Sequence, residues 1–153
     1  MQVVEPCILT RELIDYVKRL GYDNAWLEIK GDFPKEEAKK YNDVYFRVTL
    51  IPRTVKEFNI LIKRNNYEGF TIFIKPISFD IFKLSLKNKH VSVLSFDKTN
   101  SSLLLKKSVY SLLKQNPKPI EISLKYWSHL LIARAAEIGY KLGIPILFSS
   151  CAS

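Results

Sequence analysis

Short apolar runs alternate with amphipathic stretches along the whole chain. The runs are rich in Val, Ile, Phe and Leu and are bounded by turn residues, a pattern that is typical of buried strands. We therefore expect six strands, or seven if the less regular run at 3–9 is included. The six clear runs cover residues 25–31, 44–52, 70–77, 91–97, 119–127 and 144–153.

Helical segments separate these runs. Most of them begin with a side chain that can cap a helix or with a proline in the first turn. The expected helices cover 11–20, 34–41, 55–65, 79–88, 102–115 and 129–142, with start signals at Thr10, Pro34, Thr54, Ser78, Asn100 or Ser101, and Ser128. An alternation of strands and helices predicts parallel strands joined by right-handed crossovers.

A parallel α/β chain either closes into a barrel or remains an open doubly wound sheet. Open sheets usually bind a cofactor at a glycine-rich first loop, but this chain has five glycines and no such pattern. A complete eight-unit barrel needs at least about 200 residues, and this chain has 153. We therefore predict a single α/β domain over residues 1–153, an incomplete TIM-barrel-like fold of six or seven parallel βα units.

The charge distribution indicates an anionic partner. The formal net charge is +9 and the sequence pI is about 9.5, which favours nucleic acid as the partner class. Residues 1–70 hold 12 basic and 11 acidic side chains, whereas residues 71–153 hold 12 basic and 4 acidic ones. The excess charge thus belongs to the second half, although a lysine-rich surface without such a partner is the alternative. We attribute the aromatic residues to core packing rather than to base stacking.

Several classes of protein do not fit the sequence. The first 16 residues carry charges at Glu5, Arg11, Glu12 and Asp15, unlike a signal peptide. No apolar run approaches the roughly 20 residues of a membrane span, so we expect a soluble, cytoplasmic protein.

Metal and thiol chemistry are also poorly supported. Cys7 and Cys151 lie near opposite ends of the chain, without the paired spacing of a zinc site, and we expect two buried free thiols. His90 and His129 are the only histidines and belong to no metal-binding motif, so we expect both at the surface.

Catalytic groups would be expected at the carboxyl ends of parallel strands. Asp97 and Asp32 are a conceivable acid–base pair, and the serines of FSSCAS lack a nucleophile motif. Asp97 precedes the turn TNSS, where a carboxylate can accept backbone N–H bonds. We therefore expect Asp97 to fix the loop that presents Lys98, and we predict no catalytic residue.

Basic residues form a more coherent set. In SSLLLKKSVYSLLKQ, an apolar stripe of Leu105, Val109, Leu112 and Leu113 leaves Lys107 and Lys114 together on another face. Arg134 and Lys141 repeat the same spacing on the next helix. With Lys98, Lys118 and Lys125 they predict a surface that neutralises several phosphates.

Three segments, taken in order, resemble ribonuclease P protein component 3, the 30-kilodalton-type subunit of archaeal and eukaryal ribonuclease P. That family has a strand ending in V-x-x-L-S-F-D, a lysine-bearing helix, E-I-S-L-R and a strand ending in S-S-G-A. The matching positions are Val91 to Asp97, Lys106 and Lys107, Glu121 to Lys125, and Ser149 to Ala152. Lys125 replaces the usual arginine, and Cys151 replaces the usual glycine.

The resemblance implies a barrel related to the polymerase and histidinol phosphatase superfamily, without that superfamily's histidine-rich metal site. It also implies a subunit of the ribonucleoprotein that removes the 5′ leader from precursor tRNA. The RNA component would carry catalysis and magnesium, so the protein itself would bind no cofactor or metal. The expected partners are ribonuclease P RNA, precursor tRNA, a Pop5-type subunit and other ribonuclease P proteins.

Within this interpretation, basic side chains offset the repulsion between packed RNA phosphates. The first-choice RNA-binding residues are Lys98, Lys107 and Lys125, and the second-choice residues are Lys75, Lys106, Lys114, Arg53 and Arg134. Two alternatives stay open. One is a stand-alone barrel phosphoesterase, which would need Asp32, Asp97 and Glu121 in one pocket. The other is a general RNA-binding module.

Overall fold

Seven parallel strands form one sheet in chain order. The computed structural model describes residues 4–29, 44–64 and 69–151. The predicted parallel TIM-barrel-like fold is confirmed, and the irregular run at 3–9 is a strand. The strands are β1 (Val4–Ile8), β2 (Asn24–Glu28), β3 (Tyr45–Leu50), β4 (Phe70–Ile74), β5 (Val93–Phe96), β6 (Ile120–Ser123) and β7 (Ile146–Ser149).

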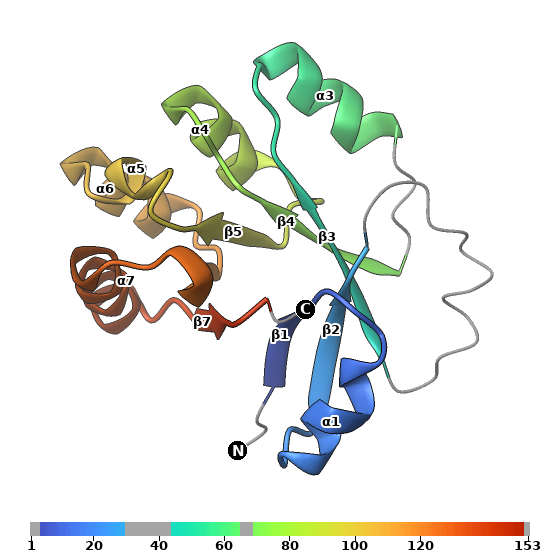
Figure 1. The fold of residues 1–153 in the computed structure, drawn as a ribbon. Helices are drawn as coiled ribbons and strands as arrows, with labels where there is room; N and C mark the ends of the chain where they lie inside the picture. Colours follow the sequence, from blue (N-terminus) through green and yellow to red (C-terminus); the bar gives the residue numbers. More distant parts are fainter. Residues whose placement is uncertain (1–3, 30–43, 65–68, 152–153) are drawn as a thin grey trace.

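Helices follow most of the strands and cover the outside of the sheet (Figure 1). The hydroxyls of Thr54, Ser78 and Ser128 accept N–H bonds from the first turns of α3, α4 and α7, as predicted. The expected helix at 34–41 lies outside the described residues. Among the described residues, no helix is long and apolar enough to cross a membrane. The helices are α1 (Leu13–Arg19), α3 (Val55–Arg64), α4 (Phe79–Lys87), α5 (Ser101–Leu104), α6 (Lys107–Gln115) and α7 (His129–Leu142), with a 3-10 turn η1 (Leu124–Tyr126).

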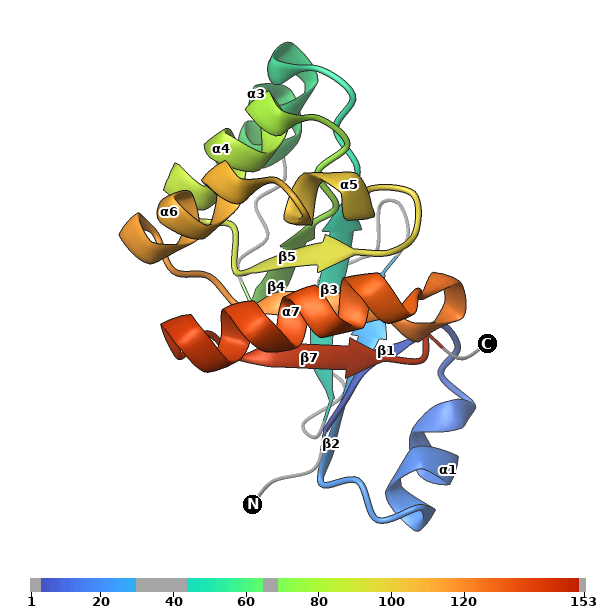
Figure 2. The same ribbon diagram turned by 90° about the vertical axis from the view of Figure 1, so that its left-hand side faces the viewer.

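The sheet curves into a nearly closed barrel whose two edge strands are β1 and β7. In Figure 2 the arrows of β5 and β7 point the same way, and Figure 1 looks onto their carboxyl ends. A disulfide joins Cys7 of β1 to Cys151 after β7, with a Cα–Cα distance of 4.6 Å. The Ser150 N–H also donates to Oε1 of Glu5, at 3.3 Å. These contacts link the two ends of the sheet.

The expectation of two free thiols was therefore wrong. Cys7 and Cys151 are 144 residues apart in sequence, and only closure of the barrel brings them together. Their spacing carries no sign of this proximity, because the curvature of the sheet determines it.

The single helix expected over 102–115 is broken in two. Lys106 has extended backbone angles (φ −66°, ψ 134°) and separates α5 from α6. The break turns Leu103 and Leu104 into the core, and it leaves Leu105 37% exposed. Leu105 is thus not part of the apolar stripe that Val109 forms on α6.

The hydrophobic core lies between the sheet and the helices rather than inside the barrel. Alternate residues of each strand face the helices, as Leu94 and Phe96 of β5 and Ile120 and Ile122 of β6 do. This follows from the period of two in a strand. The other set of alternate residues lines the barrel interior, and several of them are polar or charged.

Candidate nucleic-acid interface

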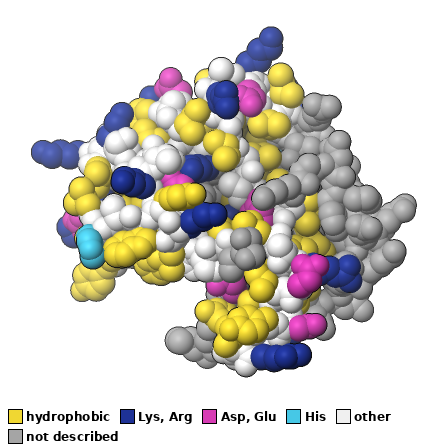
Figure 3. All heavy atoms as spheres, viewed as in Figure 1, with side chains coloured by type: hydrophobic (Ala, Val, Ile, Leu, Met, Phe, Trp, Pro, Cys, Tyr) yellow, Lys and Arg dark blue, Asp and Glu magenta, His cyan; other side chains and the backbone are white. Residues whose placement is uncertain are grey.

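The carboxyl ends of four neighbouring strands are each followed by a basic residue. Strands β3 to β6 are adjacent in the sheet, and they are followed by Arg53, Lys75, Lys98 and Lys125 respectively. Because paired strands lie about 4.8 Å apart, these four residues, which we call the basic rim, follow one another along one end of the barrel. Figure 3 looks onto this end and shows Lys and Arg side chains interspersed with hydrophobic ones.

Within the basic rim, Lys75 has its charge neutralised. Its Nζ lies 2.5 Å from Oδ2 of Asp97, and Oδ1 of Asp97 accepts bonds from the N–H (2.8 Å) and hydroxyl (2.6 Å) of Thr99. Burial raises the pKa of Asp97, but the hydrogen bonds from Lys75 and Thr99 outweigh this effect and hold the pKa below its ordinary value. Asp97 is thus an ionised carboxylate engaged in ordering the loop.

Asn100 fixes the same loop from the inside. Its side chain is buried; the Oδ1 accepts the Asp97 N–H at 2.9 Å, and the Nδ2 donates to the carbonyl of Pro76 at 2.9 Å. The Lys98 N–H donates to the carbonyl of Tyr126 in η1 at 2.7 Å. The loop after β5 is therefore held to the chain after β4 and after β6, while the Lys98 side chain is exposed.

Helix α6 and the residue before it present further exposed lysines. Lys106, Lys107 and Lys114 are all exposed, and the Nζ of Lys106 lies 4.9 Å from the centre of the Phe79 ring. Across the described part of the chain, Lys107 and Lys114 form no ion pair. Both remain available to an anionic partner.

The matching row expected on α7 is largely neutralised. Arg134 and Lys141 both bind Glu137, with N–O distances of 2.7 Å each. Hydrogen bonds from Lys141 and Arg134 lower the pKa of Glu137. Arg134 also donates from Nε to the carbonyl of Leu104, at 3.3 Å. Arg134 is thus engaged in contacts between helices.

Lys118 does not belong with the basic rim, contrary to its expected place beside Lys98. Its Nζ donates to the carbonyls of Asn88 (3.1 Å) and Val91 (2.5 Å), which precede β5. Lys118 therefore lies at the amino ends of the strands, opposite the rim. Burial lowers its pKa.

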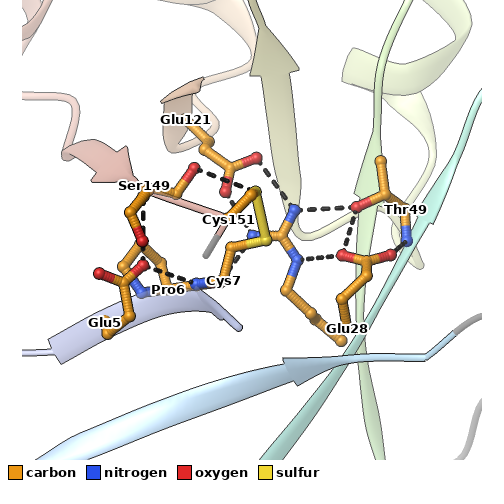
Figure 4. Close-up of polar contacts among 10 residues, drawn as sticks. Glu5, Pro6, Cys7, Glu28, Thr49, Glu121, Ser149 and Cys151 are labelled. Carbon is orange, nitrogen blue, oxygen red and sulfur yellow. Dashed lines mark hydrogen bonds and ion pairs between the residues drawn. A yellow bond between two sulfur atoms is a disulfide. The ribbon is translucent and has the colours of Figure 1, made fainter. Parts of the chain in front are cut away.

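An ion-pair network that sequence reasoning missed fills the barrel interior. The guanidinium of Arg47 is 2.7 Å from Oε2 of Glu28 and binds both carboxylate oxygens of Glu121. It also donates to the Pro6 carbonyl at 2.6 Å and to the Thr49 hydroxyl at 2.8 Å. Figure 4 shows these groups converging from different strands. One buried arginine thus ties β1, β2, β3 and β6 together.

The signal for this network was an arginine in the middle of the apolar run VYFRVTLIP. A charge at an alternate position of a buried strand must face the barrel interior and needs partners there. Arg47 is 1% exposed, and its guanidinium carbon lies 3.6 Å from the centre of the Phe73 ring.

The carboxylate cluster required for a phosphoesterase is not assembled among the described residues. Asp97 and Glu121 bind different cations, Lys75 and Arg47 respectively, and Asp32 lies outside the described residues. No group of three potential metal ligands occurs in the described part of the chain. His90 and His129 are exposed, as expected.

No family model matches the chain, and no curated protein matches it. Among solved structures, the chain is similar to one in a cryo-EM structure of archaeal ribonuclease P with mature tRNA. The TM-score is 0.75 at 16% sequence identity, and the match covers 97% of this chain and 74% of that chain. At this identity the likeness shows a shared fold, which is the barrel described above.

Proposed function

We propose that this chain is a protein subunit of ribonuclease P, of the component 3 type, and that it binds RNA through the basic rim and α6. The single observation that carries the proposal is the fold shared with a chain of archaeal ribonuclease P, since it extends over 97% of this protein. The ordered motifs between Val91 and Ala152 support the same subunit.

The charge pattern supports an electrostatic role. Residues 98–136 contain seven basic side chains and one acidic residue, Glu121, which is buried and bound to Arg47. Within the described residues, Arg134 is paired with Glu137, whereas the exposed Lys98, Lys107, Lys114 and Lys125 form no ion pair. Such a surface lowers the repulsion between RNA helices and reduces the magnesium needed to fold them. Lys125, in place of an arginine, contributes charge but not bidentate geometry.

The proposal assigns catalysis to the RNA component, together with the magnesium that it binds. Among the described residues, Asp97, Glu28 and Glu121 already hold cations of the protein, and Glu5 accepts backbone N–H bonds from Cys7 and Ser150. A carboxylate that is committed to an ion pair is a poor general base or metal ligand. The expected protein partner is a Pop5-type subunit.

Reconstituted cleavage of precursor tRNA tests the proposal. Ribonuclease P RNA and the other protein subunits are assembled with or without this chain, and the cleavage rate is measured against magnesium concentration. We expect the chain to lower the magnesium requirement and to cleave nothing alone. Cleavage by the chain without RNA would favour the phosphoesterase, and no effect on the assembly would favour a general RNA-binding module.

A combined Lys98→Ala, Lys107→Ala and Lys125→Ala variant tests the mechanism. Each lost phosphate contact reduces the salt slope of RNA binding by about one unit, so we expect a reduction of roughly two to three units. The control is Lys118→Ala, which removes a charge from the opposite end of the barrel. An unchanged salt slope in the combined variant would refute the basic rim and α6 as the RNA contact.

A further inference from the structure

Two adjacent aromatic side chains project from the rim beside the basic residues. The sequence predicted a strand over 119–127, but β6 ends at Ser123 and the chain turns into η1. Tyr126 and Trp127 are consequently 55% and 46% exposed. Core packing, to which the aromatic residues were attributed from the sequence, does not account for this pair.

The backbone around these rings is held in place on both sides. The Tyr126 carbonyl accepts the Lys98 N–H at 2.7 Å, and the Ser128 hydroxyl caps α7. The Trp127 ring packs edge-on against the His129 ring, with centres 4.8 Å apart and an angle of 83°. An exposed aromatic pair on a fixed turn loses little conformational entropy when a ligand stacks on it.

The surroundings of the pair are positively charged. The Nζ of Lys125 lies 5.7 Å from the centre of the Tyr126 ring, and residues 122–136 contain no acidic side chain. The hydrogen bond from Lys98 to Tyr126 brings a second lysine to the same place. Exposed aromatic rings beside lysines are the arrangement with which proteins bind single-stranded nucleic acid.

We propose that Tyr126 and Trp127 form a stacking platform for an unpaired RNA base, whose flanking phosphates contact Lys125 and Lys98. The occupant is RNA rather than a protein segment because two lysines, and no acidic residue of this stretch, border the rings. This inference rests on the proposed function and specifies a class of RNA element for the site, a single-stranded loop or end. Base-paired RNA would reach the lysines but not the rings.

Tryptophan fluorescence tests the platform directly. In a Trp26→Phe background, Trp127 is the single tryptophan, and a stacked base quenches its emission. The chain is titrated with a single-stranded RNA of about 12 nucleotides and with a duplex of the same length. We expect strong quenching by the single strand and little by the duplex. Equal quenching by both RNAs would overturn the proposal.

Variants separate stacking from charge and from folding. Trp127→Ala should weaken binding of the single strand about 5- to 100-fold, with an unchanged salt slope, while Trp127→Phe should retain most of the affinity. The control is Tyr140→Ala, which removes a 92% exposed aromatic ring from the far end of α7. Equal affinity of Trp127→Ala and Tyr140→Ala would refute stacking. So would a Trp127→Ala variant that loses assembly with a protein subunit while it keeps its RNA affinity.

The reconstituted cleavage assay separates a failure of the ribonuclease P assignment from a failure of the stacking platform. If this chain has no effect on precursor-tRNA cleavage but Trp127 is still quenched by single-stranded RNA, the ribonuclease P assignment fails and the platform stands. If the chain supports cleavage, but single-stranded RNA does not quench Trp127 and Trp127→Ala keeps the RNA affinity of the parent, the platform fails and the assignment stands.

Discussion

In the described part of the chain, the charges inside the barrel are buried and paired, whereas most of those on its rim are exposed and unpaired. Inside, Arg47 is 1% exposed and is bound to Glu28 and Glu121. On the rim, Lys98 and Lys125 are exposed, and within the described residues neither forms an ion pair. The difference teaches that position, rather than sign, separates charges that hold the fold from charges that are available to RNA.

The Lys75–Asp97 pair lies between these extremes. It stands on the rim but is partly buried, with side chains 19% and 9% exposed. If buried, paired charges hold the fold and exposed ones do not, substitutions in the interior network should cause the largest loss of folding stability. Opening the disulfide that closes the barrel should cause the next largest loss, and substitution in the Lys75–Asp97 pair a smaller one. The exposed lysines should have almost no effect on stability.

Removal of the interior guanidinium should have the largest effect. Arg47→Ala leaves two buried carboxylates without their cation, which typically costs about 3–5 kcal/mol in the free energy of unfolding. Urea denaturation at neutral pH measures the loss. Lys107→Ala serves as the exposed control, with a change within about 0.5 kcal/mol.

A second variant shows whether the loss comes from unpaired charge. Arg47→Met combined with Glu28→Gln and Glu121→Gln removes every charge of the network. Because this variant leaves no uncompensated buried charge, it should be more stable than Arg47→Ala. If Arg47→Ala were as stable as the wild type, the interior charges would stabilise the fold no more than the exposed rim charges do.

Opening the link between the edge strands should have the next largest effect. The disulfide closes a loop of 144 residues, and removal of a native disulfide typically costs about 2–5 kcal/mol. Cys7→Ser and Cys151→Ser should lose similar amounts of unfolding free energy. A reducing agent should lower the stability of the wild type toward theirs and leave both variants unchanged. Indifference of the wild type to reduction would mean that the barrel closes without this bond.

The sequence predicted the regular part of the fold well. Short apolar runs located all seven strands, and the hydroxyls of Thr54, Ser78 and Ser128 marked the starts of their helices. These signals are local, because strand periodicity and capping depend on neighbouring residues. The disulfide and the Arg47 network escaped prediction because they join residues that only the curvature of the sheet brings together.

The candidate site was predicted only in part, because local signals can be found in the sequence and contacts between distant residues cannot. Lys98, Lys107 and Lys125 could be found as exposed charges next to strand ends or on a helix face. The bonds of Lys118 to backbone carbonyls and the pairing of Arg134 with Glu137 depend on neighbours that helical spacing does not specify. Exposure of Trp127 follows from the early end of β6, which the apolar pattern of PIEISLKYW concealed.

Of the three classes of contact, the Lys75–Asp97 pair should have the smallest effect on stability, and the effect of Asp97→Asn should depend on pH. The amide cannot form the ion pair with Lys75, so we expect a loss of about 1–2 kcal/mol at pH 7. Burial raises the pKa of Asp97, but hydrogen bonds from Lys75 and Thr99 outweigh this effect and hold the pKa below its ordinary value. A lowered pKa in the folded state means that the carboxylate stabilises the fold above about pH 4 and that this contribution is lost as the pH falls through the folded pKa.

The difference in unfolding free energy between the wild type and Asp97→Asn should therefore be constant from pH 7 to about pH 5 and should shrink below about pH 4. Urea denaturation at several pH values measures this difference. Asp80→Asn is the matched control, because its carboxylate is 75% exposed and lies 3.6 Å from Lys83, so its removal should change little at any pH. A difference in unfolding free energy for Asp97→Asn that stays constant down to pH 3 would show that Asp97 acts through its shape and not its charge. The Lys75–Asp97 pair would then be neither a stabilising ion pair like that of Arg47 nor a pair of exposed charges.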